Sequence, residues 1–315
     1  MNENVLNEGG KAIKSAKPIR GDYAMVAANE IIGILQKKYP NNHFSTLGST
    51  GKKDSSSYSG DIDIAIDIPI ENAEEIVDYI SNNNTVKTRL QGNQLETNFM
   101  KGLKILSIGF PWASRGVGQD SYGVVQCDLM FVPNVDRAKY FYYSPDFTKN
   151  QSQFKGSVRN IFMIAILKNI PVKEEQNTTF SNGSTKDLWK YTIKPQDGIV
   201  LLHQSYEGKK GQQLKSKHTI KEDTKVILED PTKFTKFIMG PNADETTVSS
   251  FEEMWKYVNS DKFPWKEQRD KMIKDFVEDL TNENTNNTKL VDSVKDYINN
   301  NSPHGLSSAF RRGIV

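Results

Sequence analysis

The chain has 315 residues, of which 25% are charged and 36% hydrophobic, and its formal net charge at pH 7 is only +2. This length suits two ordinary domains. The near-neutral balance excludes a protein drawn to nucleic acid by its overall charge, so any basic binding surface would have to be local. The longest unbroken apolar run, residues 161–167, is far shorter than a membrane span. We therefore expect a globular protein with no membrane partner.

Cysteine usage and the first residues bear on the cellular compartment. Cys127 is the only cysteine, which excludes an intramolecular disulfide and a thiolate zinc cluster. Residues 1–20 are polar, lack the apolar stretch of a secretory signal, and are expected to form a flexible N-terminus. These features favour a cytoplasmic protein.

A first domain is predicted over residues 21–150. It opens with an amphipathic helix, because apolar residues recur at near-helical spacing from Gly21 until Pro40 ends the run. A second helix is expected at residues 71–82. The predicted strands share alternating or continuous apolar residues and cover residues 43–47, 61–68, 85–90, 103–110 and 122–132. These elements predict a mixed sheet with flanking helices.

A second domain is predicted over residues 151–315. It is expected to be mainly helical, with a β-rich insertion at residues 188–228 that contains a turn at residues 195–198. Its predicted helices cover residues 157–169, 232–239, 251–258, 265–280 and 290–299. The fold class is therefore α/β (α+β), with a mixed-sheet domain followed by a mainly helical one.

Asp61 and Asp63 lie one residue apart in a predicted strand. Because side chains alternate across a strand, both carboxylates leave one face while Ile62 and Ile64 leave the other. Two carboxylates about 7 Å apart along a strand repel each other unless a cation lies between them. Asp128 adds a third carboxylate from a later, apolar strand. Hard divalent cations prefer oxygen ligands, so we predict a site for two Mg²⁺ or Mn²⁺ ions.

A Gly-Ser pair, Gly48 and Ser49, is separated from Asp61 by eleven intervening residues. A glycine lets the backbone approach a polyphosphate closely, and a serine hydroxyl with neighbouring amides can donate hydrogen bonds to phosphate oxygens. Together with the carboxylates, the pair predicts a bound nucleoside triphosphate such as ATP, whose phosphates are neutralised by metal ions.

In this order, these residues resemble the polymerase β-type nucleotidyltransferase superfamily, over residues 20–135. Its members share a Gly-Ser or Gly-Gly pair at a helix start, an Asp-x-Asp strand and a third carboxylate. The resemblance implies that Ser49 contacts the triphosphate and that Asp61 and Asp63 bind both metals. It also implies that Asp128 holds the catalytic metal and helps to deprotonate the attacking hydroxyl.

The roles of several charged residues stay open at this stage. By the resemblance, Lys155 and Arg159 would be further nucleotide-binding residues, although basic side chains at a domain junction are also common. Asp67 is a possible fourth ligand or the cap of its strand, and Lys52 would reach phosphates or only solubilise a loop. The lysine-rich stretch at residues 209–225 would follow a phosphodiester backbone or form a solvated face.

The function implied is nucleotidyl transfer, in which an acceptor hydroxyl attacks the α-phosphate of a nucleoside triphosphate and pyrophosphate leaves. The favoured acceptor is an RNA 3′ end, with transfer RNA included, because a second domain with a lysine-rich insertion suits a polymer. One alternative keeps the chemistry but modifies a small molecule, a nucleotide or a protein, or makes cyclic or short oligonucleotides. The other is a non-catalytic domain that only binds or assembles.

Overall fold

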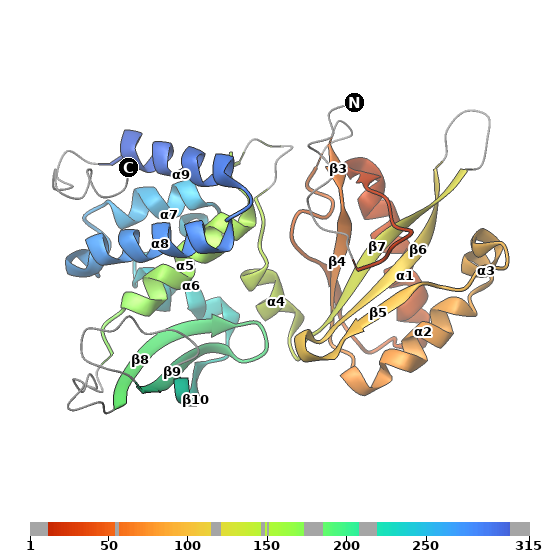
Figure 1. Ribbon diagram of the computed structural model, residues 1–315, viewed down its shortest axis with the longest axis horizontal. Coiled ribbons are helices and arrows are strands. Elements are labelled where there is room, and N and C mark those ends of the chain that lie inside the picture. The colour runs from red at the N-terminus through yellow and green to blue at the C-terminus, as the bar shows by residue number, and fades with distance from the viewer. Residues whose placement is uncertain are drawn as a thin grey trace. The chain divides into compact units, whose positions relative to one another are not determined.

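The computed structural model describes residues 12–53, 57–114, 121–145, 149, 151–172, 185–207 and 219–302. The chain divides into two compact units, Met1–Gln153 and Phe154–Val315 (Figure 1). Both contain helices and strands, and the first contains a mixed sheet, which confirms the predicted fold class.

The first unit is built on a five-stranded sheet with the order β2-β4-β7-β6-β5. The pair β4 and β7 is parallel, and every other neighbouring pair is antiparallel. The strands of the unit are β1 (Ile19–Arg20), β2 (Phe44–Thr46), β3 (Tyr58–Ser59), β4 (Asp61–Ile66), β5 (Thr97–Met100), β6 (Ile105–Ser114) and β7 (Ser121–Phe131). Its helices are α1 (Gly21–Lys38), α2 (Ala73–Ser81), α3 (Asn84–Leu90) and α4 (Val135–Phe141).

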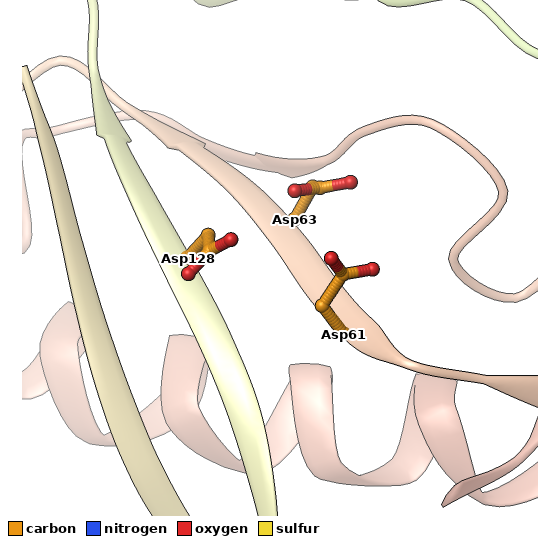
Figure 2. Close-up of side chains that lie close together, drawn as sticks. All are labelled: Asp61, Asp63 and Asp128. Atoms are coloured by element: carbon orange, nitrogen blue, oxygen red, sulfur yellow. The ribbon is translucent and has the colours of Figure 1, made fainter. Parts of the chain in front are cut away.

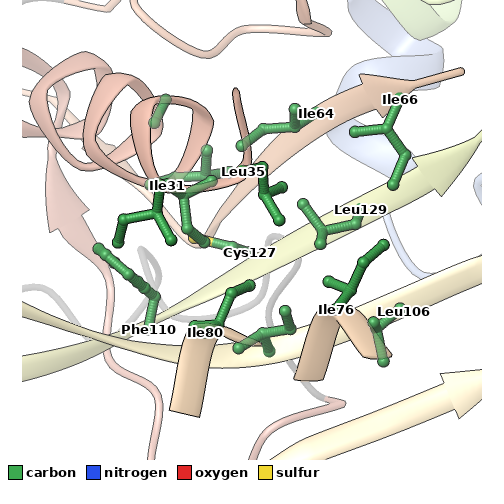
Figure 3. Close-up of a cluster of buried hydrophobic side chains, with 14 of the residues drawn as sticks. Ile31, Leu35, Ile64, Ile66, Ile76, Ile80, Leu106, Phe110, Cys127 and Leu129 are labelled. Atoms are coloured by element: carbon green, nitrogen blue, oxygen red, sulfur yellow. The ribbon is translucent and has the colours of Figure 1, made fainter. Parts of the chain in front are cut away.

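Helices α1 and α2 cover one face of this sheet and form the main core of the unit (Figure 3). In α1 the buried positions recur every three or four residues, so a single face of the helix is removed from water. That face meets the apolar side of β4, β6 and β7, including Ile64, Leu129 and Phe110, none of which is exposed. At about 25 cal/mol per Å² of apolar surface buried, this core is the main source of stability for the sheet.

The predicted strand at residues 85–90 is wrong, because these residues form helix α3. The Asn83 side chain accepts hydrogen bonds from the backbone N–H groups of Thr85 and Val86 and thereby caps the helix. Thr85, Val86 and Thr88 are β-branched, so their strand propensity opposes a helix, but the cap and the burial of Val86 prevail. One edge of the sheet is formed by β5, which the sequence pattern did not predict.

Part of the N-terminus predicted to be flexible is held against the sheet. Within residues 12–20, Ile13 and Ile19 are buried, and β1 pairs with β3. The backbone N–H of Lys17 donates to the carbonyl oxygen of Val124 at 2.8 Å. These two apolar side chains and this hydrogen bond hold the segment against the sheet, so its polar composition was misleading. The remainder of the predicted N-terminus, residues 1–11, lies outside the described residues.

The second unit combines helices with an antiparallel sheet of order β10-β9-β8. Its strands are β8 (Thr185–Lys194), β9 (Gly198–Glu207) and β10 (Thr219–Leu228), in the stretch predicted to be β-rich. Its helices are α5 (Gly156–Asn169), α6 (Phe234–Met239), α7 (Phe251–Val258), α8 (Arg269–Glu283) and α9 (Thr288–Asn300). The rings of Phe162, Phe251 and Phe276 pack together inside this unit, with centroids 4.9–5.3 Å apart. None of the helices in the described ranges has the length and apolar content to cross a bilayer.

Candidate metal and nucleotide site

The three predicted aspartates meet on one face of the five-stranded sheet (Figure 2). The parallel register of β4 and β7 places Asp63 opposite Asp128 and Asp61 opposite Gln126. Residues opposite each other across a ladder share a face, and the alternation within β4 keeps Asp61 on the same side. Each aspartate offers an oxygen that lies within 4.8 Å of the other two. The predicted meeting of Asp61, Asp63 and Asp128 is therefore confirmed.

The cluster gathers three carboxyl groups, of which Asp61 and Asp63 are half-buried and Asp128 is buried. Asp128 is only 9% exposed. Burial, followed by repulsion from Asp61 and Asp128, raises the pKa of Asp63 from 3.8 to about 8. Both causes disfavour the charged form, so the folded chain holds these three side chains together at a cost in free energy.

The donor set fits a hard divalent cation. Three carboxylates provide only oxygen ligands, which Mg²⁺ and Mn²⁺ prefer, and they supply the negative charge that such an ion neutralises. Removal of the mutual repulsion by a cation would also restore the charged form of Asp63. Asp61, Asp63 and Asp128 are thus the residues that would hold the metal.

Gly48 lies directly against the cluster, in a tight turn that follows β2. Its φ is +57°, in the left-handed region, and a Cβ placed on it would come within 3.1 Å of Asp63 Oδ2. The turn is also joined to β4 by the backbone, because the N–H of Leu47 donates to the carbonyl oxygen of Asp63 at 2.9 Å and the N–H of Asp63 donates to Thr50 Oγ1 at 3.3 Å. The Gly-Ser pair predicted from the sequence therefore lies beside the aspartates.

The conformation after Gly48 and Ser49 differs from the one that the resemblance implied. The pair was expected at a helix start, but residues 49–51 form a turn. Hydrogen bonds from Thr50 N to Leu47 O and from Lys52 N to Ser49 O close this turn. Any phosphate contact here would depend on turn amides and the Ser49 hydroxyl, without the dipole of a helix.

The segment after α4 supports the same turn. The N–H of Gly48 donates to the carbonyl oxygen of Tyr142 at 3.1 Å, and Lys52 Nζ donates to the carbonyl oxygen of Ser144. The Lys52 ammonium also lies 4.4 Å from the ring centroid of Tyr143. Burial, followed by the charge of Asp63, raises the pKa of Tyr142. The Lys52 side chain thus links the turn to residues 143–144.

The sequence pattern gave no role to two polar residues next to Asp128. Gln126 precedes it by two residues on the same face of β7 and donates from Nε2 to both of its carboxylate oxygens, at 3.0 Å each. Ser107 lies opposite Asp128 on β6, is fully buried, and has an Oγ with no hydrogen-bond partner among the described residues. The i, i+2 spacing of Gln126 and Asp128 in the sequence was a signal that could have identified Gln126. Ser107 could be identified only from the pairing of β6 with β7.

The other candidate residues, Asp67, Lys155 and Arg159, are not part of the aspartate cluster. Asp67 accepts hydrogen bonds from the backbone N–H of His43 at 2.7 Å and contacts its Nδ1 at 2.7 Å, so it caps the end of the β2-β4 pair. Arg159 is buried in the second unit, where its Nε donates to the carbonyl oxygen of Val248 at 2.5 Å and NH1 donates to Asn160 Oδ1 at 2.9 Å. Lys155 is the N-cap residue of α5 in the same unit. Nucleotide binding by Lys155 and Arg159 stays a prediction.

Comparison with known proteins gives structural neighbours only. No protein-family model matches the chain. No curated protein sequence matches it. The match to the Leishmania infantum polymerase β ternary gap complex has 12% sequence identity, covers 49% of this chain and 48% of the polymerase chain, and has a TM-score of 0.33. A cytoplasmic RNA terminal U-transferase is 14% identical with coverages of 49% and 42% and a TM-score of 0.26. Cid1, a protein with RNA terminal uridylyl transferase activity, is 13% identical with coverages of 56% and 54% and a TM-score of 0.29.

Polymerase β, which gives its name to the superfamily that the sequence resembles, is thus among these neighbours. The chain spans about half the length of the three solved structures. TM-scores below 0.5 support no further conclusion, so the function proposed below depends on the chain's own residues.

Proposed function

We propose that the chain is a metal-dependent nucleotidyltransferase that transfers a nucleoside monophosphate from a nucleoside triphosphate to an acceptor hydroxyl. One observation carries the proposal: three carboxylates on neighbouring strands have oxygens within 4.8 Å of one another, and the Gly48 turn lies against them. The mutual repulsion of three carboxylates costs free energy, and a cation bound between them would offset that cost. A site that neutralises phosphates with metal ions needs carboxylates to hold those ions.

Each residue has a part in this reaction. Asp61, Asp63 and Asp128 would hold two divalent ions, which when bound supply charge neutralisation at the phosphates and lower the pKa of the attacking hydroxyl. Gly48 lets the turn backbone approach the triphosphate, and the Ser49 hydroxyl donates to a phosphate oxygen. Asp128 takes the proton of the acceptor hydroxyl while the hydroxyl oxygen forms a bond to the α-phosphorus. The bond between the α-phosphorus and the leaving pyrophosphate breaks.

Among acceptors we favour an RNA 3′ end, with transfer RNA included. This choice depends on the lysine-rich stretch at residues 209–225, whose residues 209–218 lie outside the described part of the chain. Within the described part, Lys221 and Lys225 are exposed on β10, although Lys221 pairs with Asp223 at 2.7 Å. A cytoplasmic location remains a prediction from the composition.

The decisive experiment follows the label from α-³²P nucleoside triphosphates incubated with the full chain and Mg²⁺ or Mn²⁺. The acceptor panel contains RNA, transfer RNA, single nucleotides, small hydroxyl compounds and protein. We expect label on RNA 3′ ends. Label on a small molecule or a protein, or in a cyclic product, would keep the reaction and overturn the acceptor.

Variants separate an enzyme from a binding module. The double variant Asp61→Asn with Asp63→Asn should abolish transfer, because it removes two charged ligands while leaving the side-chain volume unchanged. Asp67→Asn is the matched control, since this carboxylate follows the same strand but caps it, and it should transfer at the wild-type rate. Transfer by the double variant, or no transfer by the wild-type chain to any acceptor, would refute the enzyme.

A further inference from the structure

The amide of Gln126 connects Asp128 to a part of the chain more than one hundred residues away. Gln126 Oε1 accepts hydrogen bonds from the backbone N–H groups of Ala12 and Ile13, at 3.0 and 3.1 Å. Its Nε2 donates to both oxygens of Asp128. Gln126 is only 3% exposed, so water does not compete for these bonds.

The partners leave the amide a single orientation. Backbone N–H groups can only donate, and an ionised carboxylate can only accept. Reversing the Gln126 amide would therefore place its oxygen against the Asp128 carboxylate and its NH₂ against two donors. The residues at 12 and 13 thus determine which way the donor points, and the donor determines how the Asp128 carboxylate is turned.

The N-terminal segment (residues 12–17) is itself anchored on the sheet. Glu96 accepts from the backbone N–H groups of Lys14 and Ser15, at 2.6 and 3.1 Å, and from the Ser15 hydroxyl at 2.6 Å. Ile13 lies over Gly109 of β6, where a Cβ would come within 3.0 Å of its Cγ2. The segment therefore crosses β7, β6 and the residue before β5, on the face that carries the aspartates.

We propose that Gln126, held by the N-terminal segment, positions Asp128 for metal binding, an inference that rests on the proposed function. A neutral donor suits this place. A lysine or arginine would compete with the metal through its charge, and a glutamate would add a fourth carboxylate to a repelling cluster. The amide instead orients the ligand while leaving the charge of the site to the cation, as partners behind metal ligands commonly do.

Metal affinity tests the proposal without depending on the acceptor. Binding of Mn²⁺ to the full chain, measured by electron paramagnetic resonance of the free ion with no triphosphate added, should weaken about 10-fold or more in Gln126→Met. Methionine nearly preserves the volume but donates no hydrogen bond. Gln204→Met is the matched control, because Gln204 is also a strand glutamine with side-chain hydrogen bonds, to Glu222 and Tyr206, and it should bind Mn²⁺ as the wild type does.

A surface variant tests the anchor even where Gln126→Met does not fold. Glu96→Ala releases Lys14 and Ser15 without touching the core, and it should weaken Mn²⁺ binding in the same direction but less. In the metal-free protein it should also speed tryptic cleavage after Lys14, and it should broaden or shift the side-chain amide signal of Gln126.

The outcomes distinguish this inference from the function beneath it. A wild-type chain that binds no Mn²⁺ refutes the proposed function, and with it the inference. Wild-type binding that is matched within twofold by Gln126→Met overturns the role of Gln126 alone. Equal binding by Glu96→Ala, with an unchanged Gln126 amide signal, overturns the role of the N-terminal segment.

Discussion

The two faces of the five-stranded sheet carry opposite chemistry, although the same strands build both. On one face Ile62, Ile64 and Leu129 are completely buried beneath α1 and α2. On the other, one residue away in each strand, Asp63 and Asp128 lie side by side with a repulsion that raises the pKa of Asp63.

The apolar face stabilises the fold, whereas the face with the aspartates destabilises it in the absence of metal. Burial of apolar side chains is favourable wherever it occurs, whereas a carboxylate cluster lowers the stability of the metal-free fold. Carboxylates whose pKa is raised by burial and by one another are a common feature of functional sites, which is why the cluster is the candidate site of this chain. Neighbouring residues on one strand therefore offer a direct way to separate function from folding.

The largest effect is expected for Asp128→Asn. The substitution preserves the shape of the side chain but removes its charge and its capacity to take the hydroxyl proton, so nucleotidyl transfer should fall about 10³-fold or more. Steady-state transfer measured beside the melting temperature checks this, and the metal-free variant should melt no lower than the wild type. Transfer within about tenfold of the wild type would exclude Asp128 from the chemistry.

Leu129→Ala, one residue later on the opposite face, should show the reverse pattern. Leu129 is fully buried, and truncation of such a leucine leaves a cavity that costs about 2–5 kcal/mol of unfolding free energy. Transfer per folded molecule should stay within about twofold of the wild type. Urea unfolding measures the loss of unfolding free energy. A loss of transfer without destabilisation would contradict the division of roles between the two faces.

The pH dependence of the metal-free protein should reveal the cluster. The pKa of Asp63 is about 8 in the folded chain and 3.8 ordinarily, so between these values the folded state binds more protons than the unfolded state. Its unfolding free energy therefore falls as pH rises from about 4 to about 8, by up to a few kcal/mol. Urea unfolding in EDTA at pH 5 and pH 8 measures the slope, which Asp63→Asn should reduce.

Asp67 provides a control of opposite sign at the end of the same strand. Burial alone would raise its pKa, but the hydrogen bonds from His43 outweigh burial and hold the pKa below its ordinary value. Its contribution to stability is present above the unfolded pKa and is lost as pH falls through the folded one. Asp67→Asn should leave the decline between pH 5 and pH 8 unchanged. A slope that disappears in Asp67→Asn but survives in Asp63→Asn would show that the cluster is not its source.

The smallest effect is expected for Gly48→Ala. A left-handed conformation costs a residue with a Cβ about 1–2 kcal/mol, and the new methyl group would press on Asp63. We expect a loss of stability of that size and a decrease in transfer of about tenfold from the displaced carboxylate. Gly33→Ala is the control, because Gly33 lies in α1 with open space around it and should gain stability instead. Equal behaviour of the two variants would show that the approach of Gly48 to Asp63 has no consequence.

Local sequence was sufficient wherever a property belongs to one element. Alternation within a strand places Asp61 and Asp63 on one face whatever the strand pairs with, and it likewise puts Cys127, which is fully buried, on the side of its strand opposite Asp128. Propensity failed at residues 85–90, because a capping side chain and one buried valine outweighed β-branched residues. The prediction of a flexible N-terminus from its polar composition also failed at Ile13 and Ile19, because their burial depends on a surface built by later strands.

The sequence by itself determined the chemistry of the site: which carboxylates share a face, and that a glycine precedes them. Only the tertiary structure decided the arrangement. The register of β4 against β7 brings Asp128 opposite Asp63, the turn after β2 brings Gly48 to Asp63, and the N-terminal segment reaches Asp128 through Gln126. The physical reason is distance along the chain. Periodicity acts over neighbouring residues, whereas strand register and long-range hydrogen bonds join residues that only the folded core brings together.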